Sequence, residues 1–198
     1  MMNNISQKEK AERFRELHHT GEMLILPNIW DSLGALLMES LEYPAIATAS
    51  ASVALSSGYN DGENIPFNDV LLLLKKITKS VNVPVTADVE GGYADSDVQL
   101  QENIKLLIDA GIAGINIEDT DKKTNSLRSV DAQSHRIKLI RKVADETGIP
   151  LFINARTDVY LHLGNFNGDE VKFEEVIKRG VAYKEAGADG FFPIIVTK

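Results

Sequence analysis

The chain has 198 residues, of which 43% are hydrophobic and 25% charged, and it contains no cysteine. This composition suits one folded domain and excludes a disordered chain, disulfide bonds, cysteine-ligated metal centres and thiolate catalysis. The formal net charge of -8 argues against binding to nucleic-acid phosphates. The polar amino terminus and the short apolar runs resemble neither a signal peptide nor a membrane span. We therefore expect a soluble, cytoplasmic protein with no nucleic-acid or membrane partner.

Short apolar runs alternate with longer amphipathic stretches, and this alternation predicts the secondary structure. Strands are expected at residues 23–27, 45–49, 83–87, 114–117, 151–154 and 190–195. Helices are expected at residues 6–17, 33–37, 67–80, 97–110, 131–144 and 173–186. Ser6 has capping-box spacing to Glu9, and Ser32, either Ser96 or Asp97, and either Ser129 or Asp131 are further candidates for helix starts. Strict alternation of strand and helix predicts parallel strands covered by helices.

Recurring strand entries favour a (β/α)8 TIM-type barrel over an open doubly wound sheet. Residues 109–115 resemble residues 185–191, and each segment is typical of a helix end, a glycine stop and a strand start. A doubly wound sheet usually carries G-x-G-x-x-G after its first strand, and this chain does not. Such a barrel typically takes about 250 residues, and only six βα units are visible here. The expected fold is an α/β barrel that is incomplete, in a single domain over residues 1–198.

Polar residues follow the predicted strands where a barrel places its functional groups, at the carboxyl ends. Asp88 and Glu90 follow the third strand, Glu118 the fourth and Arg156 the fifth. Carboxylates are the hard ligands that Mg²⁺ prefers, and a guanidinium binds a carboxylate or phosphonate with two parallel bonds. Alternation along an extended chain would place Asp88 and Glu90 on one face. The pattern predicts a site for a divalent cation and a small α-keto acid, where a metal-bound enolate would be stabilised.

Each of these residues, taken alone, also has an ordinary structural interpretation. An Asp-x-Glu pair is more often part of a solvated loop, and Glu118 could be an ordinary acidic loop residue. Arg156 could form a structural salt bridge with Asp158, and Ser50 could cap a turn. The four histidines have no metal-ligand spacing. The occurrence of the acidic residues and the arginine at successive strand ends favours a site.

Several motifs resemble, in order, the isocitrate lyase/phosphoenolpyruvate mutase superfamily, and within it the phosphoenolpyruvate phosphonomutase-like group. They are PNIWD at 27–31, ATASASVA at 47–54, GYNDGE at 58–63, TADVEGGY at 86–93, NIED at 116–119 and NARTD at 154–158. The resemblance implies an (α/β)8 barrel and Mg²⁺-dependent making or breaking of C–C or C–P bonds next to an α-keto acid. It also implies a homo-oligomer, a dimer or a tetramer.

The resemblance assigns a role to individual residues around the cation. Asp88 would be the principal metal carboxylate and would also contact the substrate. Glu90 and Glu118 complete the predicted metal set, and with the catalytic candidate Asp61 they would hold metal-bound waters. This set predicts Mg²⁺ as the cofactor.

A second group of residues would contact the substrate. Arg156 and the backbone around Ser50 and Ala51 would bind the oxygens of the acid. Residues 123–126 resemble the gating loop of phosphoenolpyruvate mutase and phosphonopyruvate hydrolase, in which Lys123 and Asn125 would close over the substrate. A polar mobile loop is the alternative interpretation of this short match.

Two departures bear on the subfamily. Lyases of the superfamily carry a catalytic cysteine in this loop, and its absence here disfavours the cysteine-dependent lyase reactions. Ala49 stands where the mutases have a serine, and Glu90 where they have an aspartate. The Asp-x-Glu form is more similar to the broad mutase-like group and to relatives of oxaloacetate decarboxylase.

Three hypotheses follow for the function. The first is a Mg²⁺-dependent enzyme that acts on a phosphonopyruvate- or oxaloacetate-like acid through a pyruvate enolate. The second is a non-catalytic or truncated barrel that lacks the last two βα units. The third is a lysine Schiff-base aldolase, which is disfavoured because no lysine lies at a predicted strand end.

Overall fold

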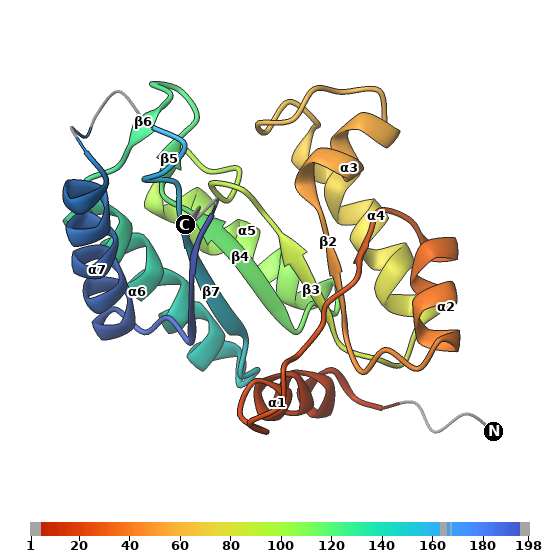
Figure 1. Cartoon of the computed structure of the whole chain (residues 1–198). Coiled ribbons are helices and arrows are strands. Elements are labelled where there is room, and N and C mark those ends of the chain that lie inside the picture. Colours follow the sequence, from red (N-terminus) through yellow and green to blue (C-terminus); the bar gives the residue numbers. More distant parts are fainter. Residues whose placement is uncertain (1–4, 163–165, 167, 195–198) are drawn as a thin grey trace.

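The structure, a computed structural model, describes residues 5–162, 166 and 168–194. Six parallel strands form one sheet in chain order (Figure 1). They are β1 (Asn28–Ile29), β2 (Ile46–Thr48), β3 (Val85–Asp88), β4 (Gly114–Glu118), β7 (Phe152–Thr157) and β8 (Gly190–Pro193). The helices are α1 (Gln7–Leu17), α2 (Ser32–Ser40), α3 (Ser50–Ser56), α4 (Phe67–Ser80), α5 (Asp97–Asp109), α6 (Val130–Thr147) and α7 (Asp169–Glu185). An antiparallel hairpin of β5 (Thr120–Asp121) and β6 (Ser126–Leu127) follows β4.

This arrangement confirms the predicted α/β fold with six parallel strands. Each strand pairs with the next strand of the sheet along the chain, as the parallel strands of a TIM-type barrel do. Within the described residues the sheet does not close, because β1 and β8 lie at its two edges. The fold is therefore TIM-barrel-like and open.

The first strand and the cap of the following helix differ from the prediction. The apolar run at residues 23–27 is not a strand, and sheet pairing begins only at Asn28. Leu24 and Leu26 instead pack against the cluster around Phe14, so hydrophobic packing on α1 uses these side chains. The N-cap of α2 is Asp31 rather than Ser32, because Asp31 Oδ1 accepts the N–H of Gly34 at 2.7 Å.

The other predicted helices form close to their expected positions. Ser6 and Glu9 make the predicted capping box at the start of α1, and Ser96 and Ser129 cap α5 and α6. The helix α7 begins at Asp169, four residues before its predicted start, with two acidic residues in its first turn. Negative charge at that end is favoured by the helix dipole. The helix α3 and the β5–β6 hairpin are not predicted from the sequence.

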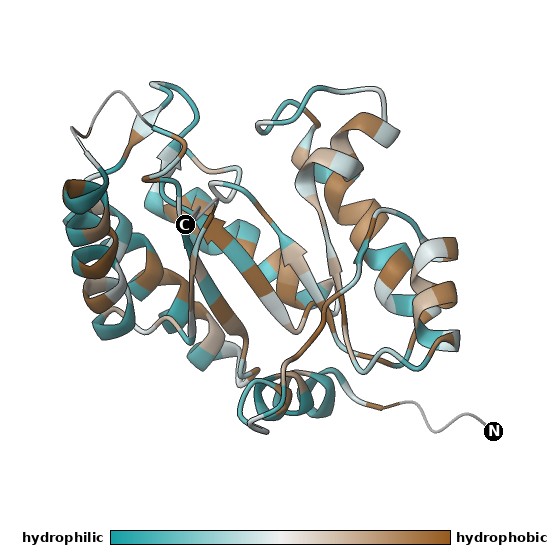
Figure 2. Cartoon of the chain, viewed as in Figure 1, coloured by the Kyte–Doolittle hydropathy of each residue, from teal (hydrophilic) through white to brown (hydrophobic). Residues whose placement is uncertain are grey.

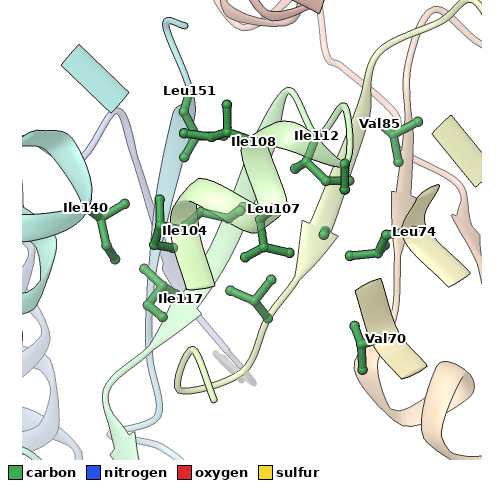
Figure 3. Packing of buried hydrophobic residues seen from close by; sticks show 14 of the residues in the cluster. Val70, Leu74, Val85, Ile104, Leu107, Ile108, Ile112, Ile117, Ile140 and Leu151 are labelled. Carbon is green, nitrogen blue, oxygen red and sulfur yellow. The ribbon is translucent and has the colours of Figure 1, made fainter. Parts of the chain in front are cut away.

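The main hydrophobic core lies between the sheet and helices α4, α5 and α6. Figure 3 shows Leu74 of α4, Leu107 of α5 and Ile140 of α6 among the buried side chains of this core, with Ile140 on the side of Ile117 of β4 and Leu74 on the side of Val85 of β3. The helices are amphipathic, but α2 and α7 also leave apolar side chains exposed, among them Leu33 and Leu37 of α2 and Phe173 and Ile177 of α7 (Figure 2). None of the helices in the described segments has the length and apolar character needed to cross a bilayer.

The two ends of the sheet have different coverings. At the amino ends of the strands, α1 lies across the sheet, and Phe14 packs against Gly114 so closely that a Cβ there would lie 2.6 Å from the ring (Figure 1). A glycine at the start of β4 is therefore required by packing. The β5–β6 hairpin lies at the opposite end, where the strands finish. Polar side chains lie at this carboxyl end of the sheet.

Candidate active site

Asp88 ends β3 and is held in a fixed orientation by its neighbours. Its Oδ2 accepts a hydrogen bond from the Ser50 hydroxyl at 3.0 Å, and its Oδ1 accepts the N–H of Glu90 at 3.2 Å. Its own N–H donates to Thr48 Oγ1 at 3.2 Å. Burial raises the pKa of Asp88 above its ordinary value. A carboxylate buried in this way is stabilised by a cation beside it.

Arg156 joins carboxylates from two strands and a loop. The register of the sheet places Arg156 of β7 directly beside Glu118 of β4, and its Nη1 lies 3.2 Å from Glu118 Oε2. The same nitrogen is 3.9 Å from Asp88 Oδ2, and Nε donates to Asp158 Oδ1 at 2.7 Å. Burial alone would lower the pKa of Arg156, but the carboxylates of Glu118 and Asp158 outweigh it and raise the pKa. The salt bridge with Asp158 thus forms, and the same side chain also faces Glu118 and Asp88.

Lys122, a residue absent from the sequence-based site, lies between two predicted metal carboxylates. Its Nζ is 2.6 Å from Glu118 Oε1 and 2.9 Å from Glu90 Oε2. Burial raises the pKa of Glu118 to about 7, against an ordinary 4.5. Burial lowers the pKa of Lys122, but its bonds to Glu118 and Glu90 outweigh that effect and raise it. The hairpin brings this lysine back to a strand end, which could have been inferred only from its place four residues after Glu118.

Glu90 reaches this cluster by a route other than the predicted one. The strand β3 ends at Asp88, and Glu90 has a left-handed backbone with φ of 49°. The expected extended alternation of positions 88 and 90 is therefore wrong, because the chain already turns at Glu90. Its Oε1 accepts the N–H of Glu63 at 2.9 Å and the hydroxyl of Tyr93 at 3.2 Å. Glu90 is almost completely buried as a result.

Ser50 and Ala51, the predicted substrate-binding pair, are the first two residues of α3. The N-cap of this helix, Ala49, makes no side-chain hydrogen bond to the first turn. The first N–H groups of a helix have no acceptor within the helix. The backbone at Ser50 and Ala51 therefore suits an anionic oxygen next to Asp88.

Three predicted catalytic residues lie on loops outside this cluster. Asp61 is an exposed turn residue whose backbone carbonyl accepts a hydrogen bond from Asn64. Lys123 is 69% exposed and forms an ion pair with Asp95 at 2.9 Å. Asn125 is exposed in the turn of the β5–β6 hairpin, with a left-handed φ of 49°. Their assigned roles stay predictions.

The oxygen donors of the cluster suit a hydrated Mg²⁺ with one direct carboxylate, and they do not suit a Mg²⁺ enclosed by three carboxylates. Nowhere in residues 5–162, 166 and 168–194 do three histidine or acidic side chains come close enough together to hold one metal ion. Mg²⁺ usually takes only one or two direct carboxylates and keeps several waters. The cluster therefore fits a hydrated cation with Asp88 as its direct ligand and does not form a cage of three carboxylates.

A second set of buried charges lies beside the first but faces α7. Asp119, next to Glu118, has no exposed surface, and its Oδ2 accepts hydrogen bonds from Thr157, Arg179 and Tyr183 at 2.6 to 2.9 Å. Its Oδ1 accepts the N–H of Asp158 at 2.9 Å. Every donor to Asp119 belongs to β7, to the residue after β7, or to α7. This network fastens α7 to the sheet.

Comparison with known proteins identifies the family. The family described as phosphoenolpyruvate phosphomutase matches residues 14–198, nearly the whole chain, and the chain belongs to this family. A protein of Burkholderia cenocepacia J2315, provisionally named a phosphonomutase, has a crystal structure that matches with a TM-score of 0.91 and 38% identity. The match covers 96% of this chain and 76% of that chain. This result confirms the resemblance found in the sequence motifs.

The named relatives are lyases and mutases. The 2-methylisocitrate lyase of Halalkalibacterium halodurans is 30% identical, over 95% of this chain and 61% of the relative. The 2,3-dimethylmalate lyase of Eubacterium barkeri is 29% identical, over 92% of this chain and 62% of the relative. The chain thus spans less than two thirds of the length of these curated relatives.

Proposed function

We propose that this chain carries the cation- and enolate-binding site of a Mg²⁺-dependent enzyme. The enzyme would make or break a C–C or C–P bond of a small, phosphonopyruvate- or oxaloacetate-like α-keto acid. The observation that supports this proposal is the meeting of Asp88, Glu118 and Arg156 at the carboxyl ends of three adjacent parallel strands. Membership of a family with lyases and mutases among its named relatives agrees with it.

The residues of this chain would have distinct tasks in such a reaction. Ser50 fixes the carboxylate of Asp88, which would hold the cation. Arg156 would bind oxygens of the acid with its guanidinium, which already faces the cluster. When bound, Mg²⁺ supplies a Lewis acid that stabilises the negative charge of an enolate. Lys123 and Asn125 would exclude water by moving over the substrate with the hairpin.

Two other chemistries are less well supported. The chain has no cysteine, so we propose a reaction in which none of its residues acts as a thiol acid or nucleophile. Lys122 does lie beside a strand end, against the sequence-based expectation, and this could suggest a Schiff base. Its two ion pairs raise its pKa, whereas an attacking amine must be unprotonated. A homo-oligomer and a cytoplasmic location stay predictions from the sequence.

A non-catalytic barrel remnant is the second candidate. The observation in its favour is that β1 and β8 are edge strands in the described part of the chain. Unpaired strand edges tend to pair with other chains. A remnant of this kind would keep the fold without a working cation site, so a binding measurement separates the two proposals.

The test is calorimetric titration with oxalate, a mimic of the pyruvate enolate, with and without Mg²⁺. The proposal expects oxalate binding that requires Mg²⁺ and is lost in Asp88→Ala. Asp109→Ala removes an exposed carboxylate at the end of α5 and should bind oxalate like the wild type. No binding by the folded wild type would favour the remnant, and Mg²⁺-dependent binding that survives in Asp88→Ala would refute the role of Asp88.

A further inference from the structure

Every carboxylate oxygen of Glu90 and Glu118 already lies beside a cationic or hydrogen-bonding group, although Glu90 Oε2 has only the ion pair with Lys122 and accepts no hydrogen bond in the described segments. Glu118 uses Oε1 for Lys122 and Oε2 for Arg156. Glu90 uses Oε2 for Lys122 and Oε1 for Glu63 and Tyr93. One oxygen of each carboxylate thus forms an ion pair with the ammonium of Lys122. A cation that enters the cluster therefore meets Lys122 as its competitor.

We propose that Lys122 is a resident counter-ion that a divalent cation must displace before Glu90 and Glu118 can face that cation. This inference rests on the proposed function, since it concerns the same cluster. It adds a residue that neither the sequence motifs nor the family resemblance assigned. It also makes the occupancy of the cluster depend on the position of the β5–β6 hairpin.

A nearby cavity offers the displaced ammonium somewhere to go. Lys122 also lines a hollow of about 360 Å³ that lies against the first turns of α5 and α6 and the hairpin. Acidic and basic residues line it together. Asp95, Asp97 and Asp121 already pair there with Lys123, His135 and Arg128, and Glu63 is the fourth acidic residue. Glu63 accepts the N–H of Tyr93 at 2.7 Å and has no ion pair with any residue of the described segments. A small rotation of Lys122 would exchange the two site carboxylates for this hollow, where Glu63 would be the partner of its ammonium.

The displacement would move the predicted gating residues as well. Lys122 and Lys123 are adjacent, and both lie between the two short strands of the hairpin. Lys123 is tied to the loop before α5 only by its ion pair with Asp95, in which both side chains are more than half exposed. Exposed pairs of this kind contribute little. Release of Lys122 therefore frees the hairpin turn, and cation binding and hairpin position form one coupled equilibrium.

Charge considerations give the direction of the expected effect. The ammonium of Lys122 repels any cation that approaches the cluster, and its ion pairs must be broken when Mg²⁺ takes its place. Removal of this charge in Lys122→Gln should therefore tighten Mg²⁺ binding by about tenfold, a coupling usual for groups in one charge network. Lys122→Arg should weaken Mg²⁺ binding, because a guanidinium bridges two carboxylates with a fixed fork that is harder to displace.

The first experiment measures Mg²⁺ affinity by calorimetry for the wild type and these two variants. Lys142→Gln is the matched control, since Lys142 is an exposed lysine of α6 whose one ion pair within the described residues is with Glu146, at 3.8 Å. It removes the same charge from the surface and should leave the affinity unchanged. Thermal denaturation checks that each variant is folded. If Lys122→Gln does not fold, the comparison of Lys122→Arg with the wild type still provides the test.

The second experiment follows the lysine itself. Trypsin cuts after accessible lysines, so Mg²⁺ should speed cleavage after Lys122 in the wild type, as mass spectrometry would show. A purely structural Lys122 would be protected equally with and without Mg²⁺. Equal Mg²⁺ affinity in wild type and Lys122→Gln, weaker binding in Lys122→Gln, or unchanged cleavage would each overturn the inference. If neither the wild type nor any of the variants binds Mg²⁺ in a manner that depends on Asp88, the proposed function and the inference are overturned together.

Discussion

Two neighbouring carboxylates at the end of β4, Glu118 and Asp119, are both buried and yet have opposite surroundings. Asp119 is surrounded by four directional donors, an N–H, two hydroxyls and a guanidinium, all from the last part of the sheet and α7. Glu118 faces an ammonium and a guanidinium from a hairpin and a strand, at the carboxyl ends of the strands. Its pKa is raised to about 7 by burial.

The difference separates a carboxylate that is held by the fold from one that we propose serves the cation site. Hydrogen bonds from fixed backbone and side-chain donors satisfy Asp119 completely, so its charge stabilises the fold. Glu118 is balanced by side-chain charges alone, and burial keeps its pKa high. Groups of this second kind are poised for chemistry because a ligand can replace their partners. The contrast predicts that loss of the Asp119 charge lowers the free energy of unfolding, whereas loss of the Glu118 charge removes an ionisation that destabilises the fold at high pH.

The largest expected effect comes from Asp119→Ala. Its removal would leave the hydroxyls of Thr157 and Tyr183 without their acceptor and Arg179 with only Glu175, at 2.8 Å, as a carboxylate partner in the described segments. Loss of one partner of a buried ion pair costs about 3–5 kcal/mol, and because Glu175 remains the expected cost is about 3 kcal/mol. The free energy of unfolding, measured by urea denaturation, should fall by that amount. Asp109→Ala, at an exposed position, should change it by less than about 0.5 kcal/mol. A loss below 1 kcal/mol in Asp119→Ala would show that the network does not fasten α7.

A smaller effect is expected at Glu118, where the ionised carboxylate lowers the free energy of unfolding instead of raising it. The carboxyl titrates near 4.5 when unfolded and at about 7 when folded, so the folded state binds the proton more tightly. The free energy of unfolding should therefore decrease as pH rises from 4.5 to 7, by no more than about 3 kcal/mol. Glu118→Gln should lose this part of the pH dependence, measured by urea denaturation without Mg²⁺ at pH 4.5 and 8.

The control for this pH dependence is the cation itself. Saturating Mg²⁺ should reduce the loss of stability in the wild type, because a cation favours ionised carboxylates. If the wild type and Glu118→Gln differ by the same free energy at both pH values, the environment of Glu118 does not set its ionisation. The comparison between the two carboxylates would then fail.

The smallest effect is expected from Tyr183→Phe. This change removes a hydroxyl that donates to Asp119 at 2.8 Å and accepts from Arg179 at 2.9 Å, while Arg179 keeps its own bond to Asp119 and the other donors stay in place. The free energy of unfolding should fall by about 1 kcal/mol, the usual contribution of one hydrogen bond. Mg²⁺-dependent oxalate binding should not change, since Tyr183 does not contact the cluster. Tyr59→Phe, at a partly exposed residue, serves as the control.

Local sequence rules predicted most of the fold. Parallel strands covered by helices appear as apolar runs separated by amphipathic stretches, and the caps at Ser6, Ser96 and Ser129 mark helix starts. The failures occurred where tertiary packing outweighed the pattern. The run at residues 23–27 is as apolar as a strand, but Leu24 and Leu26 pack on α1 instead of pairing.

The site was predictable in its strand-end residues and not in its partners. Asp88, Glu118 and Arg156 come together because parallel strands end at one edge of a sheet. Lys122 reaches the same edge only because a hairpin turns the chain back, and hairpins of two-residue strands leave no periodic signal. Glu90 keeps its place in the site although its backbone is left-handed, because Glu63 and Tyr93 hold its carboxylate.

The pairing of Glu118 with Arg156 across β4 and β7 has a consequence for folding kinetics. These residues are opposite one another in the register of the sheet, and a slip of one residue would turn Arg156 to the other face. The two strands are separated along the chain by the hairpin and all of α6, so their pairing is a non-local contact that forms slowly. Binding of an enolate mimic during refolding would therefore report the arrival of β7 in its correct register.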